Sequence, residues 1–150
     1  MNEANERVDE LNKLVVVNND RINGYQKAAE ETKDPDLKML FDQYSQQSSR
    51  FKMELAEEIA SLGGQVNEDT SASGDLYRTW MDVRQAMARN DKKAVLKSCE
   101  YGEDVALKTY ENVLGNGTPF SPGCQIRVEN QRAELRDAHD SIKSLRDAVS

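Results

Sequence analysis

Hydrophobic residues recur at intervals of three and four along most of this 150-residue chain, the spacing of one face of an α-helix. Polar segments rich in glycine, proline or asparagine interrupt the pattern, and none of the intervening stretches reads convincingly as a strand. The pattern therefore predicts an all-α protein. The expected helices cover residues 3–32, 35–62, 74–88, 91–114 and 122–149.

Residue types at the expected helix ends support these boundaries. Asp34 followed by Pro35 is a natural N-cap and first helical residue, so the first two long helices should form an antiparallel hairpin across a very short connection. Residues 63–64 are both glycine and can end the second helix in the left-handed conformation. Ser73 is expected to cap the short helix, and residues 121–122, Ser-Pro, to open the last one.

The segment between the second and third long helices is too long for a hairpin turn. We therefore expect a crossover that travels the length of a bundle, carries the short helix, and leaves these two long helices parallel. A weak repeat supports a second hairpin that resembles the first, because Asn18 precedes Tyr25 by the same interval as Glu103 precedes Tyr110. Hairpin, crossover and hairpin together predict one domain spanning residues 1–150.

Glu103 breaks the pattern of its own helix, because it lies in the middle of an apolar stripe formed by Val95, Leu96, Cys99, Ala106, Leu107, Tyr110, Val113 and Leu114. A buried carboxylate must be bound, paired or neutralised, and burial without a cation would raise its pKa. We expect a polar core network around it. Its predicted members are Glu103, Asn18, Tyr25, Tyr110 and Ser48, and an arginine at a stripe edge, Arg21, Arg50 or Arg136, is an alternative partner.

Several short phrases of this chain resemble a known family. They are GYQKAAE at 24–30, KDPDL at 33–37, LGG at 62–64, CEYGED at 99–104 and AHD at 138–140. Together with the helix order, they resemble small bacterial four-helix-bundle proteins of unknown function that are placed near the ferritin-like superfamily. The resemblance covers nearly the whole chain. It implies a ferritin-like four-helix bundle with an extra helix in the long crossover, and it implies no settled biochemical activity.

Ferritin-like di-iron proteins supply one Glu from each of two helices and a Glu-x-x-His motif from each of the other two. When the six ligand positions of those proteins are placed on the apolar faces of the expected helices, they fall on Asn18, Ser48, Phe51, Glu103, Leu135 and Ala138. Of these residues, only Glu103 has a side chain that could bind iron. A second alignment uses Gln47, Arg50, Arg136 and His139; it adds only His139 and puts arginines beside the metals. We therefore expect a degenerate metal site without metal or other cofactor. The alternative ligand set is Glu103, Glu100 and His139.

The formal net charge of −7 gives the chain no electrostatic reason to bind nucleic acid or an anionic membrane. Its longest aliphatic run, residues 14–17, is too short to cross a bilayer, and its acidic N-terminus is unlike a signal peptide. A cytoplasmic location is the simplest expectation. Cys99 and Cys124 show no spacing typical of a disulfide framework or zinc site, so both are expected as reduced, packed thiols.

No catalytic motif stands out, because the chain has no glycine-rich phosphate loop and no convincing Ser-His-Asp set around its single histidine. The leading hypothesis is a non-enzymatic bundle that associates with itself or with a protein partner, with stress responses as one setting. A divergent di-iron oxidase or ferroxidase is the alternative. A third hypothesis places a small-molecule site between the crossover helix and the bundle, near Trp80.

Overall fold

The computed structural model describes residues 3–71 and 74–149. This part of the chain folds into helices without strands, as the hydrophobic pattern predicts. Their observed bounds lie within one residue of the predicted ones at every end. The helices are α1 (Glu3–Glu31), α2 (Pro35–Ser61), α3 (Asp75–Ala88), α4 (Lys92–Gly115) and α5 (Pro122–Ala148).

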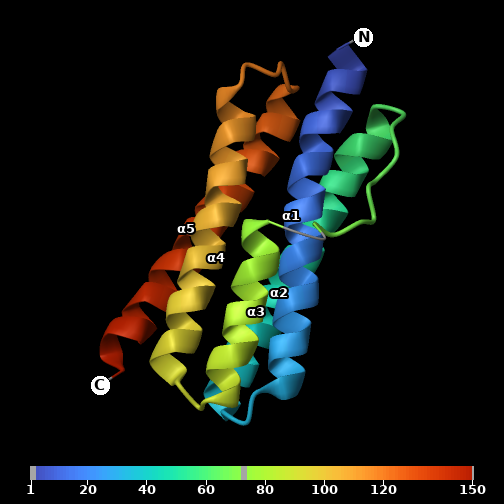
Figure 1. Ribbon diagram of the computed structural model, residues 1–150. Coiled ribbons are helices and arrows are strands. Elements are labelled where there is room, and N and C mark those ends of the chain that lie inside the picture. The colour runs from blue at the N-terminus through green and yellow to red at the C-terminus, as the bar shows by residue number, and fades with distance from the viewer. Residues whose placement is uncertain (1–2, 72–73, 150) are drawn as a thin grey trace.

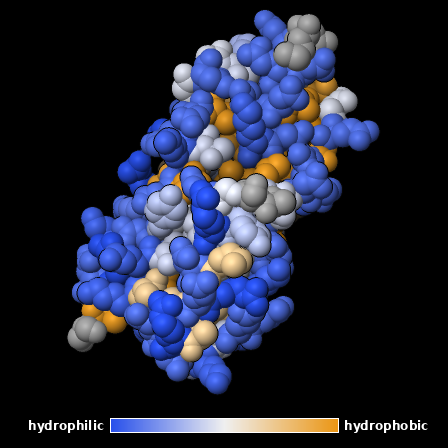
Figure 2. All heavy atoms as spheres, in the orientation of Figure 1, coloured by the Kyte–Doolittle hydropathy of each residue, from blue (hydrophilic) through white to orange (hydrophobic). Residues whose placement is uncertain are grey.

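The four long helices form two antiparallel hairpins, α1 with α2 and α4 with α5 (Figure 1). The connection from α2 to α4 returns along the molecule, so that these two helices run in the same direction, as expected from its length (Figure 1). On the way it forms α3, which lies against one half of α1 and α4 (Figure 1). Figure 2 shows apolar atoms at the surface where this cover begins.

Side chains at the helix ends satisfy backbone groups that the helices cannot bond internally. The Asp34 carboxylate accepts hydrogen bonds from the amides of Asp36 and Leu37, and Pro35 occupies the first turn of α2. Asp91 and Ser121 cap α4 and α5 in the same way. Gly74 occupies the N-cap position of α3; Ser73, the predicted cap, lies outside the described residues.

Three polar side chains of α1 hold the crossover against the bundle. Asn12 donates to the Gln65 carbonyl at 2.9 Å, and Asn19 donates to the carbonyls of residues 67 and 69 at 2.9 and 2.8 Å. The next residue, Asp20, accepts from the amide and hydroxyl of Ser71 at 2.9 and 2.6 Å. Because these bonds satisfy backbone groups of an irregular segment, they fix its path along α1.

The apolar core consists of two main clusters, one in each half of the bundle. The half that α3 covers contains Tyr25, Ala28, Leu37, Phe41, Tyr44, Val83, Leu96, Cys99 and Ile142 among its buried residues. The other half contains Leu11, Leu14, Val15, Phe51, Leu55, Ile59, Tyr110, Val128 and Leu135. Along α1, α2 and α4, the buried polar residues Asn18, Arg21, Ser48 and Glu103 lie between the two clusters. A polar layer therefore divides the core across its middle.

Close contact between α1 and α3 depends on Gly24. A Cβ atom at this position would lie 2.1 Å from Cε2 of Trp80, so the indole ring packs directly on the backbone of α1. The same ring makes an edge contact with Tyr25, with 4.7 Å between ring centroids. Trp80 thus anchors the crossover helix to the bundle.

One predicted core position is wrong. Leu145 lies three residues after the buried Ile142, where the spacing of apolar residues in the last helix predicts a core position, yet it is 43% exposed. Val149, one turn later, packs against the apolar cluster. Among the described residues, we find no helix with the length and apolar character needed to cross a membrane.

We predict that Gly24→Ala destabilises the fold by about 1–3 kcal/mol, because the new methyl group would force the Trp80 ring out of its place. Gly123→Ala is the matched control: its Cβ would meet nothing within 4 Å, and we expect a change within about 0.5 kcal/mol. Urea unfolding followed by circular dichroism measures both. Equal stabilities of the two variants would contradict the proposed contact.

Candidate functional site

The centre of the polar layer is an ion pair between Arg21 of α1 and Glu103 of α4. Each side chain is only 1% exposed. The guanidinium donates from Nε to Oε2 at 2.9 Å and from Nη2 to Oε1 at 2.6 Å, so both carboxylate oxygens are engaged. This two-point contact is the strongest geometry available to an arginine and a carboxylate.

The remaining donors of Arg21 reach α2. Nη1 donates to the Ser48 hydroxyl at 2.6 Å, and Nη2 donates to the Gln47 side-chain carbonyl at 3.2 Å. The guanidinium carbon also lies over the rings of Tyr25 and Tyr44, at 5.4 and 5.9 Å from their centroids. The buried cation is therefore surrounded by acceptors and aromatic faces from two helices in addition to its partner on α4.

Arg21 keeps its charge in this position. Burial alone would lower its pKa, but the Glu103 carboxylate raises the pKa of Arg21 above the ordinary value. An isolated charge would be costly in this interior, and each member of the pair removes that cost for the other. Glu103 thus obtains a fixed cation from the chain itself.

A second hydrogen-bonded chain runs beside the ion pair. Asn18 donates to the Tyr110 hydroxyl at 2.8 Å, and this hydroxyl donates to the Gln131 side-chain carbonyl at 2.6 Å. Gln131 in turn donates to the Phe51 carbonyl at 3.2 Å and to the Glu54 carboxylate at 2.9 Å. Burial raises the pKa of Tyr110, so its hydroxyl stays protonated and available as a donor. This chain connects all four long helices.

The structure distributes the predicted network residues over these two groups. Glu103 and Ser48 meet through Arg21, whereas Asn18 and Tyr110 belong to the adjacent chain. Tyr25 presents its ring to Arg21. Among the arginines considered as partners, Arg21 is the one that enters the core.

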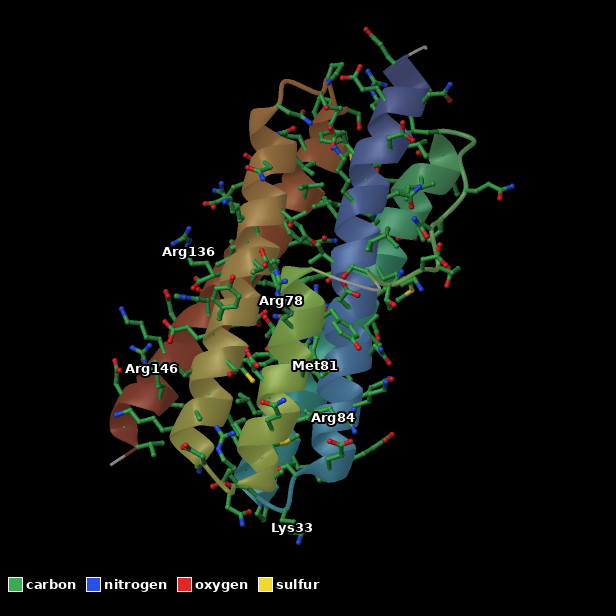
Figure 3. All side chains as sticks on the ribbon, in the orientation of Figure 1. Lys33, Arg78, Met81, Arg84, Arg136 and Arg146 are labelled. Carbon is green, nitrogen blue, oxygen red and sulfur yellow. The ribbon has the colours of Figure 1, made fainter. Side chains whose placement is uncertain are left out.

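The other two arginines remain at the surface. The side chains of Arg50 and Arg136 are 46% and 57% exposed and pair with Glu134 and Glu111. Figure 3 shows Arg136 on the outer side of the bundle. The sequence did carry a signal for Arg21: it follows Asn18 by three residues and precedes Tyr25 by four, which puts it on the core face of α1. Gln47 and Gln131 were not predicted as members of a polar network.

Half of the first set of di-iron positions is apolar. Phe51, Leu135 and Ala138 are buried within the hydrophobic clusters, and the one acidic member, Glu103, has both oxygens bound to Arg21. A di-iron site needs several carboxylates to neutralise its cations. These residues do not fit such a site.

The alternative ligand set, Glu103 with Glu100 and His139, does not form a cluster either. His139 Nε2 lies 2.8 Å from an Asp104 oxygen and 3.6 Å from a Glu100 oxygen, on the flank of α4. Glu100 is also paired with Arg146, while Glu103 points into the core. In the described ranges, we find no group of three or more His, Cys, Asp or Glu side chains that could hold a metal ion.

We predict that removing either partner of the buried pair costs about 3–5 kcal/mol, because the other charge is left buried and unpaired. Arg21→Met and Glu103→Leu test the two partners, and the double variant should lose much less than the sum of the single losses. Free energies of unfolding from urea titrations provide the comparison. Additive losses would mean that the pair is not coupled.

An exposed ion pair supplies the control for this cycle. Arg136→Met removes the partner of Glu111, at the surface, and we expect a change of about 0–1 kcal/mol. A loss as large as that of Arg21→Met would indicate that the methionine substitution, rather than burial of the charge, causes the effect.

We also predict slow thiol chemistry in the folded chain. Burial and the nearby Glu103 charge raise the pKa of Cys99 well above its ordinary value, and burial, with a smaller contribution from Glu58, raises that of Cys124 to about 11. At pH 8 the thiolate fraction of Cys124 should be about a hundredfold below that of a free cysteine. Reaction with Ellman's reagent should therefore be slow in buffer and fast in urea.

Because both pKa values are higher in the folded chain than in the unfolded one, the unfolded chain loses its thiol protons first as pH rises. The cysteine contribution to stability should therefore decrease above about pH 8.5. Equally fast labelling of folded and unfolded protein would contradict the burial of both thiols.

Comparison with known proteins gives a family but no biochemical activity. Residues 6–116, which include α2, α3, α4 and nearly all of α1, match the family described as "Domain of unknown function (DUF2383)". Both members of the Arg21–Glu103 pair lie inside this match, whereas α5 lies beyond it. No curated protein matched the chain. Since the match covers well over half of its length, the chain belongs to the DUF2383 family.

Proposed function

We propose that the chain is a ferritin-like four-helix bundle in which an ion pair occupies the place of a metal site in the core. We further propose that it works by association with itself or with a protein partner. The observation that carries this proposal is the two-point contact of Arg21 with Glu103. The ferritin-like relationship is supported by the paired hairpins, the parallel α2 and α4, and the crossover between them (Figure 1).

The Arg21 guanidinium neutralises the Glu103 carboxylate, the charge that a metal ion would otherwise neutralise. In a ferritin-like di-iron protein, inward carboxylates from several helices balance two cations. Here the corresponding region supplies the carboxylate of Glu103 and the neutral oxygens of Ser48 and Gln47, all of which accept from Arg21. The Asn18 side-chain oxygen is the remaining buried acceptor at these positions, and it carries no charge to balance a cation. A metal ion at this position would also lie beside the guanidinium, so Coulomb repulsion would oppose its binding.

The outer faces of the bundle support a function in association. Met39 and Met53 on α2 are 73% and 62% exposed, and Ile126 on α5 is 57% exposed. Large apolar side chains in these positions contribute nothing to the core, and each would gain from burial against another chain.

We place this activity in the bacterial cytoplasm, with stress responses as a setting and with neither nucleic acid nor a membrane as partner.

Iron loading tests the proposal against the alternative of a divergent oxidase or ferroxidase. Protein purified without a histidine tag or chelator is incubated with Fe(II) and then exposed to air. We expect metal analysis to find far less than one iron per chain, and the rate of Fe(II) oxidation to equal that of buffer. About two irons per chain, lost in Glu103→Gln, would establish the alternative.

Sedimentation velocity tests the association of the full chain with itself. Over a hundredfold range of protein concentration, we expect a dimer or larger species whose fraction increases with concentration. Met53→Lys and Met39→Lys should reduce it, whereas Lys143→Met, a change at another exposed position, should not. A monomer at every concentration would contradict self-association and would require a different protein as partner.

A further inference from the structure

A cavity of about 330 Å³ lies between α1 and α3, close to the point where the crossover reaches α3. Its volume is within the range of small-molecule sites, at the lower end. One wall comes from α3 and is mainly aromatic and apolar, and the other comes from α1 and is mainly polar. The ion pair in the core lines no part of it.

The α3 wall exposes apolar surface that the bundle does not need. Tyr77 and Met81, one helical turn apart, are 49% and 43% exposed and both line the cavity. Figure 3 places Met81 and Arg84 on the side of α3 that faces α1. Aromatic and thioether surface at the mouth of a cavity favours a flat, apolar ligand, because a ligand that covers it removes apolar surface from water.

Trp80 gives the same wall a fixed shape. Its ring is held between the backbone at Gly24 and the ring of Tyr25, so it needs little reorganisation to receive a ligand. Its buried Nε1 has no hydrogen-bond partner within the described part of the chain. A buried donor without a partner is unfavourable, and an acceptor atom that reaches it would reduce this cost.

The charges around the cavity leave one positive group uncommitted. The Asp20 carboxylate is engaged by the amide and hydroxyl of Ser71, and Arg84 is paired with Glu31 at 3.1 Å. Lys27 on α1 forms no ion pair with any residue that the structure describes, although the chain carries a net charge of −7. A negative group on the ligand would find its partner there.

We propose that this cavity binds a small aromatic carboxylate, with its ring against Trp80, Tyr77 and Met81 and its carboxylate toward Lys27. The volume suits one ring or two fused rings. This site is separate from the association proposed above and does not depend on the absence of metal chemistry, so either proposal can fail alone.

Benzoate is the test ligand, and three compounds isolate its features. Benzyl alcohol keeps the ring without the charge, hexanoate keeps the charge without the ring, and benzylamine reverses the charge. Isothermal titration calorimetry of the full chain gives the affinities, and the emission of Trp80, the single tryptophan, reports on the cavity. We expect saturable benzoate binding that changes this emission and is at least about fivefold tighter than that of the other compounds.

Two substitutions of exposed residues test the assignment within the site. Lys27→Met should weaken benzoate about fivefold and leave benzyl alcohol unchanged. Met81→Asp, which adds a negative charge at the mouth, should weaken benzoate as well. Lys33→Met is the matched control, since Lys33 lies in the loop between α1 and α2, outside the cavity (Figure 3). Circular dichroism establishes that each variant is folded.

Three results would overturn the proposal. One is the absence of saturable binding for all four compounds, which would leave the apolar wall as a surface for another protein. Another is equal affinity for benzoate and benzylamine, which would exclude recognition of the charge. The last is an unchanged benzoate affinity in folded Lys27→Met relative to Lys33→Met.

Discussion

The ion pair between Arg21 and Glu103 determines how the bundle can be assembled. Neither charge can be buried alone, so α1 and α4 have to reach the interior together and in one register. A shift of α4 by one turn, about 5.4 Å, would separate the carboxylate from the guanidinium and leave both unpaired. Because Ser48 and Gln47 accept from the same guanidinium, the register of α2 is tied to it as well.

This polar layer also explains the division of the core. Apolar clusters fill the two halves of the bundle, and the second chain of Asn18, Tyr110 and Gln131 links the layer to α5. In ferritin-like enzymes, inward polar groups at such a level would bind metals and so supply reactivity. Here most of them bond to one another, and the Asn18 side-chain oxygen is left without a partner among the residues that the structure describes. The groups left to interact with other molecules are at the surface and in the cavity beside α3.

Local signals made most of the fold predictable. Helix positions followed from the spacing of apolar residues, and their ends from Asp34, Pro35 and Ser121, since caps act within a few residues. The length of the crossover correctly predicted that α2 and α4 are parallel. The bonds from Asn12, Asn19 and Asp20 to the crossover had no such signal, because each joins residues about fifty positions apart.

The candidate site was predictable only in part. Glu103 was recognisable because a charge interrupts an apolar stripe, and this anomaly is visible within one helix. Its partner was less certain, because Arg21, Arg50 and Arg136 all lie at stripe edges. The spacing of Arg21 from Asn18 and Tyr25 favours it, but only the packing of α1 against α4 brings its guanidinium to Glu103. Tyr25 was expected to contribute to a polar network, and the contact it makes with Arg21 is through its ring.

By itself, the sequence determined the all-α class, the helices and their order, and the presence of a buried carboxylate that needs compensation. Tertiary structure alone decided which cation meets Glu103, how Asn18 and Tyr110 form a separate chain, and where α3 leaves a cavity beside Trp80. The physical reason is that helical periodicity fixes the face on which each side chain lies. The rotation and separation of neighbouring helices, which bring distant side chains into contact, are set by packing of the whole bundle.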